Sequence, residues 1–176
     1  MQTSISDSGA RLSIETIDPI VVAPLDLLTF FSEHMGFLSE TAGPDLKIVV
    51  NDYGESFKVM ADTVVLRRTL FEILINARVA MPNGGDVRLT ILPMLVKEDM
   101  FLQGGDYMRM SISDKGVGFS LPALTNVLRK PEPGDRCPGL AGFAEDFTGW
   151  GGAVRVKSRR SRGTTVHLYL RRATIH

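Results

Sequence analysis

Cysteine is almost absent from this 176-residue sequence, in which Cys137 is the only one. A single cysteine cannot form a disulfide within the chain, and no Cys or His pattern around it has the spacing of a zinc site. The lack of an internal disulfide fits a reducing compartment, so we expect a cytoplasmic location.

Long apolar runs are lacking as well. The apolar stretch over residues 17–31 is interrupted by Asp18, Asp26 and two prolines, which makes it too short and too polar to cross a bilayer. No basic segment of the kind found in export signals precedes it. We therefore expect neither export nor contact of this segment with a membrane.

The sequence has no net charge, because 20 Lys and Arg balance 20 Asp and Glu. A neutral chain creates no overall field that would attract nucleic acid or an anionic membrane. The cations are nevertheless concentrated after residue 152, where no acid occurs, and several lie at residues 159–162. Clustered arginines can follow phosphates, but no aromatic residue for base stacking is interleaved here. We interpret them as a solvated strand edge and expect no nucleic-acid partner.

The length and the 44% hydrophobic content are sufficient for one packed domain. We expect a flexible segment at residues 1–10, a single domain over residues 11–172 and a short tail at residues 173–176. Residues 121–138 contain four prolines, which predicts a loop.

Periodicity predicts interspersed helices and strands. Helical spacing follows Pro19 as far as Gly43, with Leu25 and Leu28 among its apolar positions, and it recurs after Asp62, a predicted N-cap, and at residues 140–147. Alternating residues predict strands at 11–15, 46–50, 56–61, 87–91, 108–112, 153–158 and 164–170. We expect residues 46–61 to form one hairpin and residues 153–170 another. This order favours helices layered on one face of a mixed sheet.

The strand at residues 108–112 leads into Asp114-Lys115-Gly116-Val117-Gly118. Glycine at every second position permits positive φ and a close approach by another group, which nucleotide sites and ordinary turns both need. Taken alone, the motif is weak, because aspartate and glycine dominate turns.

The helix after Asp62 carries Asn76-Ala77 and ends in Ala80-Met81-Pro82-Asn83-Gly84-Gly85, which resembles the asparagine box of sensor histidine kinases. The Asp114 motif follows at the distance of the first glycine box, and residues 151–158 and 163–166 resemble the closing strands of the same ATP-binding domain. The resemblance extends over nearly the whole chain from about Arg11. It implies the GHKL or Bergerat fold, an α/β (α+β) two-layer sandwich whose mixed, mainly antiparallel sheet has helices on one face.

This resemblance also implies site residues and a function. Asn76 would coordinate the magnesium ion of Mg-ATP or Mg-ADP, and Asp114 would accept a hydrogen bond from the adenine amino group. Gly116 and Gly118 would let the backbone approach the base, and Thr164 would support Asp114, commonly through water. The implied function is the catalytic domain of a two-component sensor histidine kinase, which transfers the γ-phosphoryl group to a histidine on a separate dimerisation module.

Glu72 lies one helical turn before Asn76, on the face that also carries Val79. The opposite face carries the leucine stripe Leu66, Leu70 and Leu74. Gyrase-like ATPases use a glutamate four residues before the asparagine as a general base, so Glu72 is a candidate base. A solvated helix residue is the alternative interpretation.

The sequence departs from the family pattern at the second glycine box. Residues 128–142 form a short, glycine-poor lid in which Pro138 lacks an amide hydrogen and Gly139 remains as a candidate phosphate contact. Lys130 is a candidate source of positive charge in this lid, beside Arg129 and Arg136. Val79 also replaces a polar residue often found at its position.

No phosphoacceptor histidine motif occurs. We expect His34 to be a surface or boundary residue and His167 to be exposed. The expected partner is therefore a histidine-containing module or a response regulator. Whether the chain is an active enzyme stays open. A nucleotide-free docking module for a kinase or a response regulator is one alternative, and a GHKL ATPase or anti-sigma-type serine kinase is another.

Overall fold

The computed structural model describes residues 20–51, 57–98, 100, 102–119 and 139–173, with only the backbone described at 139–141. The elements in chain order are β1 Ala23–Asp26, α1 Leu27–Ala42, β2 Leu46–Asn51, β3 Lys58–Ala61, α2 Thr63–Ala80, β4 Gly85–Val96, β5 Gly105–Ser113, α4 Gly139–Gly149, β6 Ala153–Ser158 and β7 Thr164–Arg171. The predictions for residues 1–19, for Lys130 and for the rest of the loop at 121–138 lie outside the described residues. None of the described helices is long and apolar enough to span a membrane.

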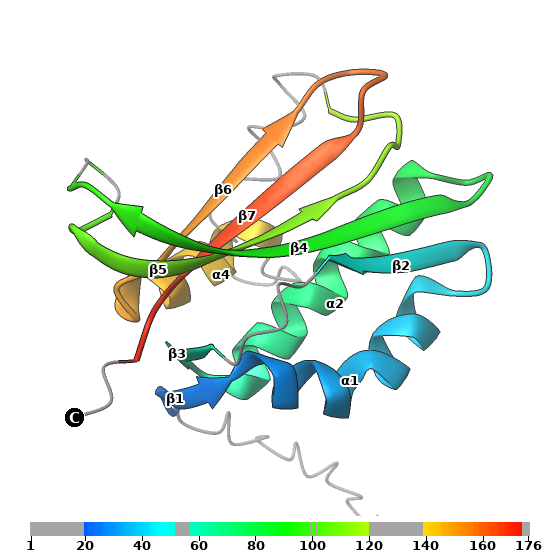
Figure 1. Ribbon diagram of the computed structural model, residues 1–176. Coiled ribbons are helices and arrows are strands. Elements are labelled where there is room, and N and C mark those ends of the chain that lie inside the picture. Colours follow the sequence, from blue (N-terminus) through cyan, green and yellow to red (C-terminus); the bar gives the residue numbers. More distant parts are fainter. Residues whose placement is uncertain (1–19, 52–56, 99, 101, 120–138, 174–176) are drawn as a thin grey trace, which may run out of the picture.

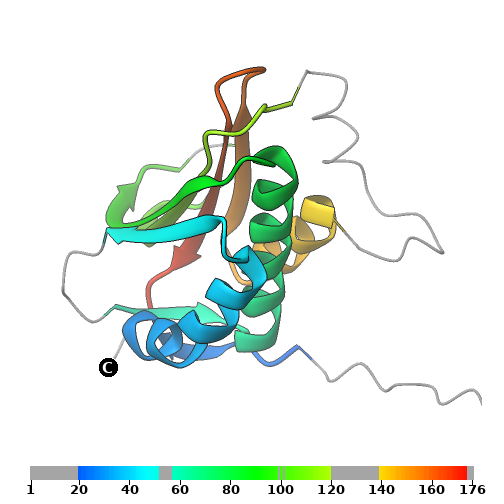
Figure 2. The same cartoon turned by 90° about the vertical axis from the view of Figure 1, so that its right-hand side faces the viewer.

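The main sheet has five strands in the order β2-β4-β5-β7-β6. β2 runs parallel to β4, and every other neighbouring pair is antiparallel. The three described helices cover one face of this sheet, as the two views in Figures 1 and 2 show. The predicted architecture, a two-layer sandwich with a mixed sheet, is confirmed.

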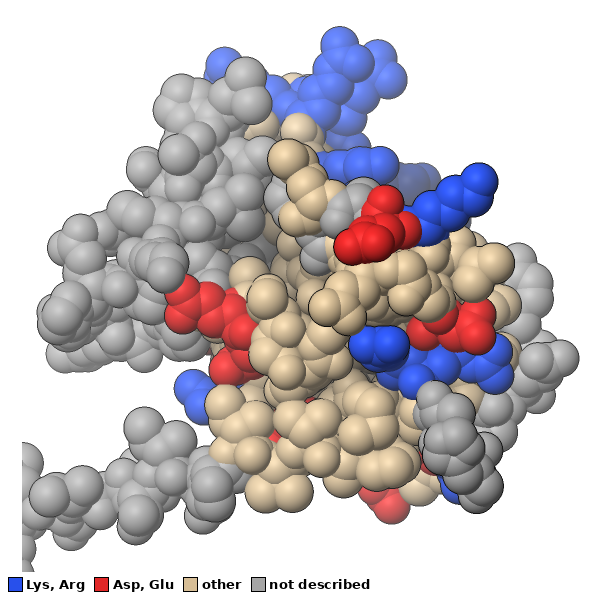
Figure 3. Space-filling view, turned by 90° about the vertical axis from the view of Figure 1, so that its left-hand side faces the viewer, with Lys and Arg blue, Asp and Glu red and all other residues tan. Residues whose placement is uncertain are grey.

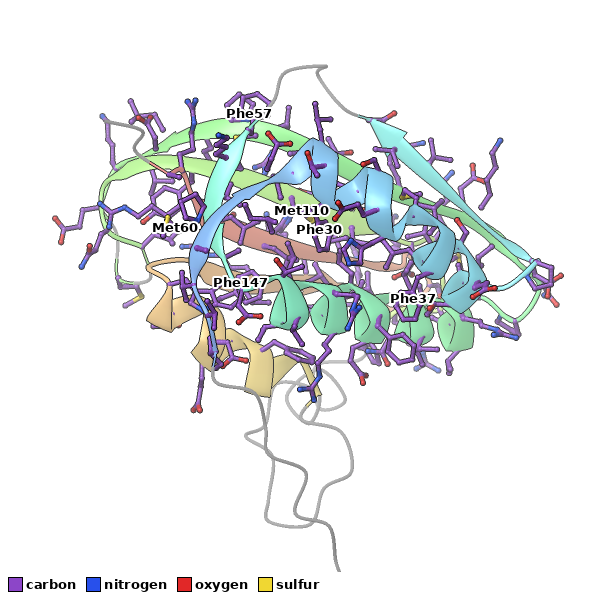
Figure 4. All side chains as sticks on the ribbon, turned by 90° about the horizontal axis from the view of Figure 1, so that it is seen from below. Phe30, Phe37, Phe57, Met60, Met110 and Phe147 are labelled. Carbon is purple, nitrogen blue, oxygen red and sulfur yellow. The ribbon has the colours of Figure 1, made fainter. Side chains whose placement is uncertain are left out.

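The core lies between the helices and the sheet. The leucine stripe of α2 is buried, as are the alternate residues Met108, Met110 and Ile112 of β5. Phe30 from α1 and Phe147 from α4 reach the same space (Figure 4) and are 1% and 0% exposed. The apolar faces of the helices and of the sheet thus pack against each other in one core, which buries both.

The start of the first helix differs from the prediction. α1 begins at Leu27, because the carboxylate of Asp26 accepts a hydrogen bond from the Thr29 amide (3.0 Å) and caps the helix. Leu25, predicted to be helical, belongs to β1. Leu28, predicted on the apolar face, is 38% exposed.

The predicted hairpin at residues 46–61 is wrong, although both of its strands exist. β3 pairs antiparallel with β1 in a separate two-stranded sheet, and β2 pairs with β4. The link between α2 and β4 holds β2 in place, since the Gly85 amide donates to the Asp45 carbonyl oxygen at 3.0 Å. Gly84 (φ +78°) lies so close to that carbonyl that a Cβ would meet it at 2.5 Å.

Asp62 caps α2, as predicted. Its Oδ1 accepts hydrogen bonds from the amides of Val64 (2.8 Å) and Val65 (3.0 Å), and its Oδ2 accepts one from the Val21 amide (2.5 Å). The residue is 5% exposed. One buried carboxylate therefore satisfies two orphan amides of the helix and holds the chain just before β1.

Asp62→Ala should lower the free energy of unfolding by about 1–2 kcal/mol, because the cap and the Val21 contact are both lost. Urea unfolding monitored by circular dichroism would measure it. Asp62→Asn is the matched control, since its amide oxygen can still accept from Val64 and Val65. Equal midpoints for Asp62→Ala and the wild type would contradict this role.

Candidate functional site

Asp114 directly follows β5 and is tied to the start of β7. Its Oδ1 accepts hydrogen bonds from the backbone amides of Gly116 (2.8 Å) and Thr164 (3.2 Å). Its own amide donates to the Thr164 carbonyl oxygen at 2.9 Å. Both of these bonds to neighbouring amides use Oδ1 rather than Oδ2.

The environment of this carboxyl affects its ionisation in two opposite ways. Partial burial raises the pKa of Asp114, because a charged carboxylate loses hydration. The amides of Gly116 and Thr164 oppose part of that rise, since they donate to the ionised form. The protein therefore keeps a carboxylate where burial disfavours the charge.

Gly116 and Gly118 are required by the packing of the chain itself. A Cβ on Gly116 would meet the Cβ of Ala80 at 2.6 Å and its carbonyl oxygen at 2.7 Å. Gly118 has φ +63°, and a Cβ there would collide with the Arg159 carbonyl oxygen. The Val117 amide also donates to the Ala80 carbonyl oxygen at 3.1 Å, so this loop is held between the end of α2 and the turn that follows β6.

Asn76 lies on α2 one turn before Ala80, about 6 Å along the helix axis. Its side chain is exposed, and Glu72, one turn earlier, is half-buried. Val79 is 77% exposed. The predicted polar face of α2 is thus directed away from the core. It runs toward the loop at residues 114–118, here called the glycine loop, so that Asn76 and Asp114 lie on neighbouring elements.

Thr164 contacts Asp114 directly through its backbone amide. Its side chain is buried, and the Thr164 hydroxyl pairs with the Ser158 hydroxyl at 2.9 Å. Ser158 also accepts from the Phe119 amide at 2.8 Å. Ser158 thereby joins β6, β7 and the glycine loop, a role that sequence reasoning missed because nothing but its place before the turn could have indicated it.

The other candidate residues lie elsewhere or are only partly described. Gly139 is the first residue of α4, which packs beside α2. His34 is half-buried, with its ring stacked on Phe30 at 4.5 Å and its Nδ1 2.8 Å from the Phe30 carbonyl oxygen. His167, predicted to be exposed, is half-buried because its strand β7 lies between β5 and β6.

Within the described residues, no group of three or more His, Cys, Asp or Glu side chains could hold a metal ion. Mg²⁺ prefers oxygen ligands, often retains waters and is commonly bound through few protein groups together with substrate phosphates. The exposed amide of Asn76 offers one such oxygen, so the residues present fit a magnesium ion that arrives with phosphates.

The profile of the family described as histidine kinase-, DNA gyrase B- and HSP90-like ATPases matches residues 61–174, more than half of the chain. A search among curated proteins found no match.

The solved structures that share the fold include those of MprB and ShkA. The mycobacterial sensor histidine kinase MprB superposes with a TM-score of 0.64 at 21% identity, over 88% of this chain and 100% of that one. Full-length ShkA in complex with AMPPNP superposes with a TM-score of 0.63 at 22% identity, over 89% of this chain but only 32% of that one. At these identities the likeness concerns the fold alone.

Asp114→Asn should stabilise the ligand-free protein at neutral pH. Because burial raises the folded-state pKa above the unfolded value, ionisation of Asp114 disfavours folding at every pH above the folded pKa. That penalty vanishes as the pH falls below the unfolded value, about 3.9, so the two stability curves should converge there. Urea unfolding across this range is the measurement. Asp106→Asn, an exposed substitution on the same strand, is the control, and a wild type more stable than Asp114→Asn at neutral pH would contradict the argument.

Proposed function

Since the chain belongs to the family of histidine kinase-, DNA gyrase B- and HSP90-like ATPases, we propose that it is the ATP-binding catalytic domain of a two-component sensor histidine kinase. One observation carries the proposal: a carboxylate held by two backbone amides at the end of β5, beside the helix end that carries Asn76. The fold shared with MprB and ShkA supports it.

Asp114 would recognise the base. Its Oδ2 would accept a hydrogen bond from the exocyclic amino group of adenine, and a hydrogen bond to a charged acceptor contributes about 1.5–3 kcal/mol. Guanine has a carbonyl oxygen at that position. This oxygen and the carboxylate oxygen are both acceptors, so no hydrogen bond could form between them. The site should therefore distinguish ADP from GDP.

Asn76 and the start of α4 would hold the phosphate end of the nucleotide. The Asn76 side chain offers an amide oxygen to the cation, and the amides in the first turn of α4, beginning at Gly139, form the type of helix terminus that binds phosphates. Magnesium, when bound with the nucleotide, supplies neutralisation of phosphate charge. Lys130 stays a proposed source of further positive charge.

The reaction that this arrangement serves is transfer of the γ-phosphoryl group to a histidine on a separate dimerisation module. Phosphoryl transfer depends mainly on positioning and charge stabilisation. Asp114, Gly116 and Asn76 would orient the nucleotide, and the acceptor would come from the partner. We place this activity in the cytoplasm, with a response regulator as a further partner.

Glu72 favours a second candidate function, an ATPase or a serine kinase. It lies on the same face of α2 as Asn76, one turn away, and it is half-buried rather than fully solvated. A carboxylate there could accept a proton from an attacking water or hydroxyl group.

Nucleotide binding is the first test. Calorimetric titration of the chain with ADP and a non-hydrolysable ATP analogue should show binding that Mg²⁺ strengthens. Asp114→Asn should weaken it about 10- to 100-fold, since the charged acceptor is lost. Asn76→Ala should remove the magnesium dependence.

Two exposed residues provide matched controls for that experiment. Asp106→Asn on β5 and Asn83→Ala after α2 remove the same chemical groups outside the site and should leave the affinity unchanged. No binding at about millimolar nucleotide would exclude the kinase proposal for this chain, and a nucleotide-free docking module for a kinase or a response regulator would take its place.

Glu72→Gln separates the two candidate functions. If the chain is a histidine kinase domain, the substitution should leave nucleotide affinity unchanged and reduce ATP hydrolysis by less than about tenfold. A loss of about 100-fold or more in hydrolysis, at unchanged affinity, would identify Glu72 as a general base and favour the ATPase or serine kinase. Release of inorganic phosphate, measured beside the calorimetric titration, gives both quantities.

A further inference from the structure

The face of the main sheet that the helices leave uncovered carries an aligned set of cations. In register across the sheet, Ser111 of β5 lies beside His167 of β7, which lies beside Arg155 of β6. The next rows on either side place Arg109 beside Tyr169, and Thr165 beside Lys157. We refer to Arg109, Arg155, Lys157 and the central His167 as the basic sheet face.

Acids are nearly missing from this surface. Among the described residues of the five strands, strand alternation directs one acid to this side, Asp86, and it lies opposite Lys47 at the β2 edge, away from β6. The strands β6 and β7 continue into the exposed basic turn at residues 159–162, where Figure 3 shows Lys and Arg gathered at the top of the molecule. Positive charge therefore extends from the sheet face to the turn.

Local contacts orient two of these side chains, His167 and Arg155. The His167 Nδ1 lies 2.9 Å from the Ser111 hydroxyl, and the guanidinium of Arg155 lies over the Tyr169 ring at 5.3 Å. The Nε of Arg109 is buried and has no hydrogen-bond partner among the described residues. A buried donor without a partner is unfavourable, so a hydrogen-bond acceptor that reached Arg109 would be stabilised there.

We propose that the basic sheet face docks an acidic segment of a partner protein, whose carboxylates face Arg109, Arg155 and Lys157. The charge complementarity is direct, because like charges that repel one another in the free chain are neutralised in the complex. The two tyrosines that could stack on bases, Tyr107 and Tyr169, are 0% and 6% exposed, which disfavours a nucleic acid. The exposed apolar neighbour Met94 also suits a protein surface.

Docking at this face should be coupled to protonation of His167. Burial, Arg109, Lys157 and Arg155 all lower the pKa of His167 in the free protein. The other groups that face it are neutral, namely Ser111 and Ser113 on β5 and Thr165 and Tyr169 on its own strand. Carboxylates would offset the three cations and raise that pKa, so complex formation takes up a proton and becomes tighter as the pH falls.

The test uses the full chain without nucleotide, so its outcome is independent of the nucleotide site. The probe is fluorescently labelled poly-L-glutamate, titrated at low ionic strength and followed by anisotropy. Lys157→Glu should weaken binding about tenfold or more. Lys58→Glu, at a residue of β3 that is also exposed, changes the net charge by the same amount outside the face and should alter affinity by less than about twofold.

His167→Gln tests the coupling. Wild-type affinity should increase between about pH 8 and about pH 6, whereas the glutamine variant should bind equally at both values. The proposal is overturned if poly-L-glutamate does not bind, if Lys58→Glu and Lys157→Glu weaken it equally, or if duplex DNA binds more tightly than poly-L-glutamate through Lys157.

Discussion

The arrangement of the site depends on one backbone hydrogen bond, from the Val117 amide to the Ala80 carbonyl oxygen. Carbonyls in the last turn of a helix have no partner within the helix, and here the loop after β5 supplies one. Gly116 makes this possible, because any side chain there would collide with Ala80. The position of Asn76 relative to Asp114 is therefore set by main-chain contacts between the helical layer and the sheet.

Local signals were sufficient to predict much of this fold. Asp62 and the leucine stripe specify α2, since a cap and a helical period both act over a few residues. The pairing of strands could not be predicted from such local signals. The alternating residues of β2 and β3 showed two strands next to each other in sequence, but their pairing with β4 and β1 depends on contacts far along the chain.

The site and its surroundings also combine features that local sequence signals predict with features that depend on distant contacts. The Asp114 motif could be found because its residues are contiguous, and its glycines are explained by close contacts with Ala80 and Arg159 that no sequence pattern displays. Ser158 belongs to the segment that resembles the closing strands, but its bonding role could not be predicted, because its three bonds join segments that meet only after folding. Alternation predicts an exposed His167, because it indicates which side of a strand a residue faces but not that β7 lies between β5 and β6, whose side chains flank it.

Asp62 connects the segment just before β1 to the first turn of α2. One of its oxygens holds the amide of Val21, where the chain approaches β1, and the other holds the first turn of the helix that carries Asn76. A displacement of the backbone at residue 21 would therefore act on the first turn of α2 through one short side chain, at the end of the helix opposite to Asn76.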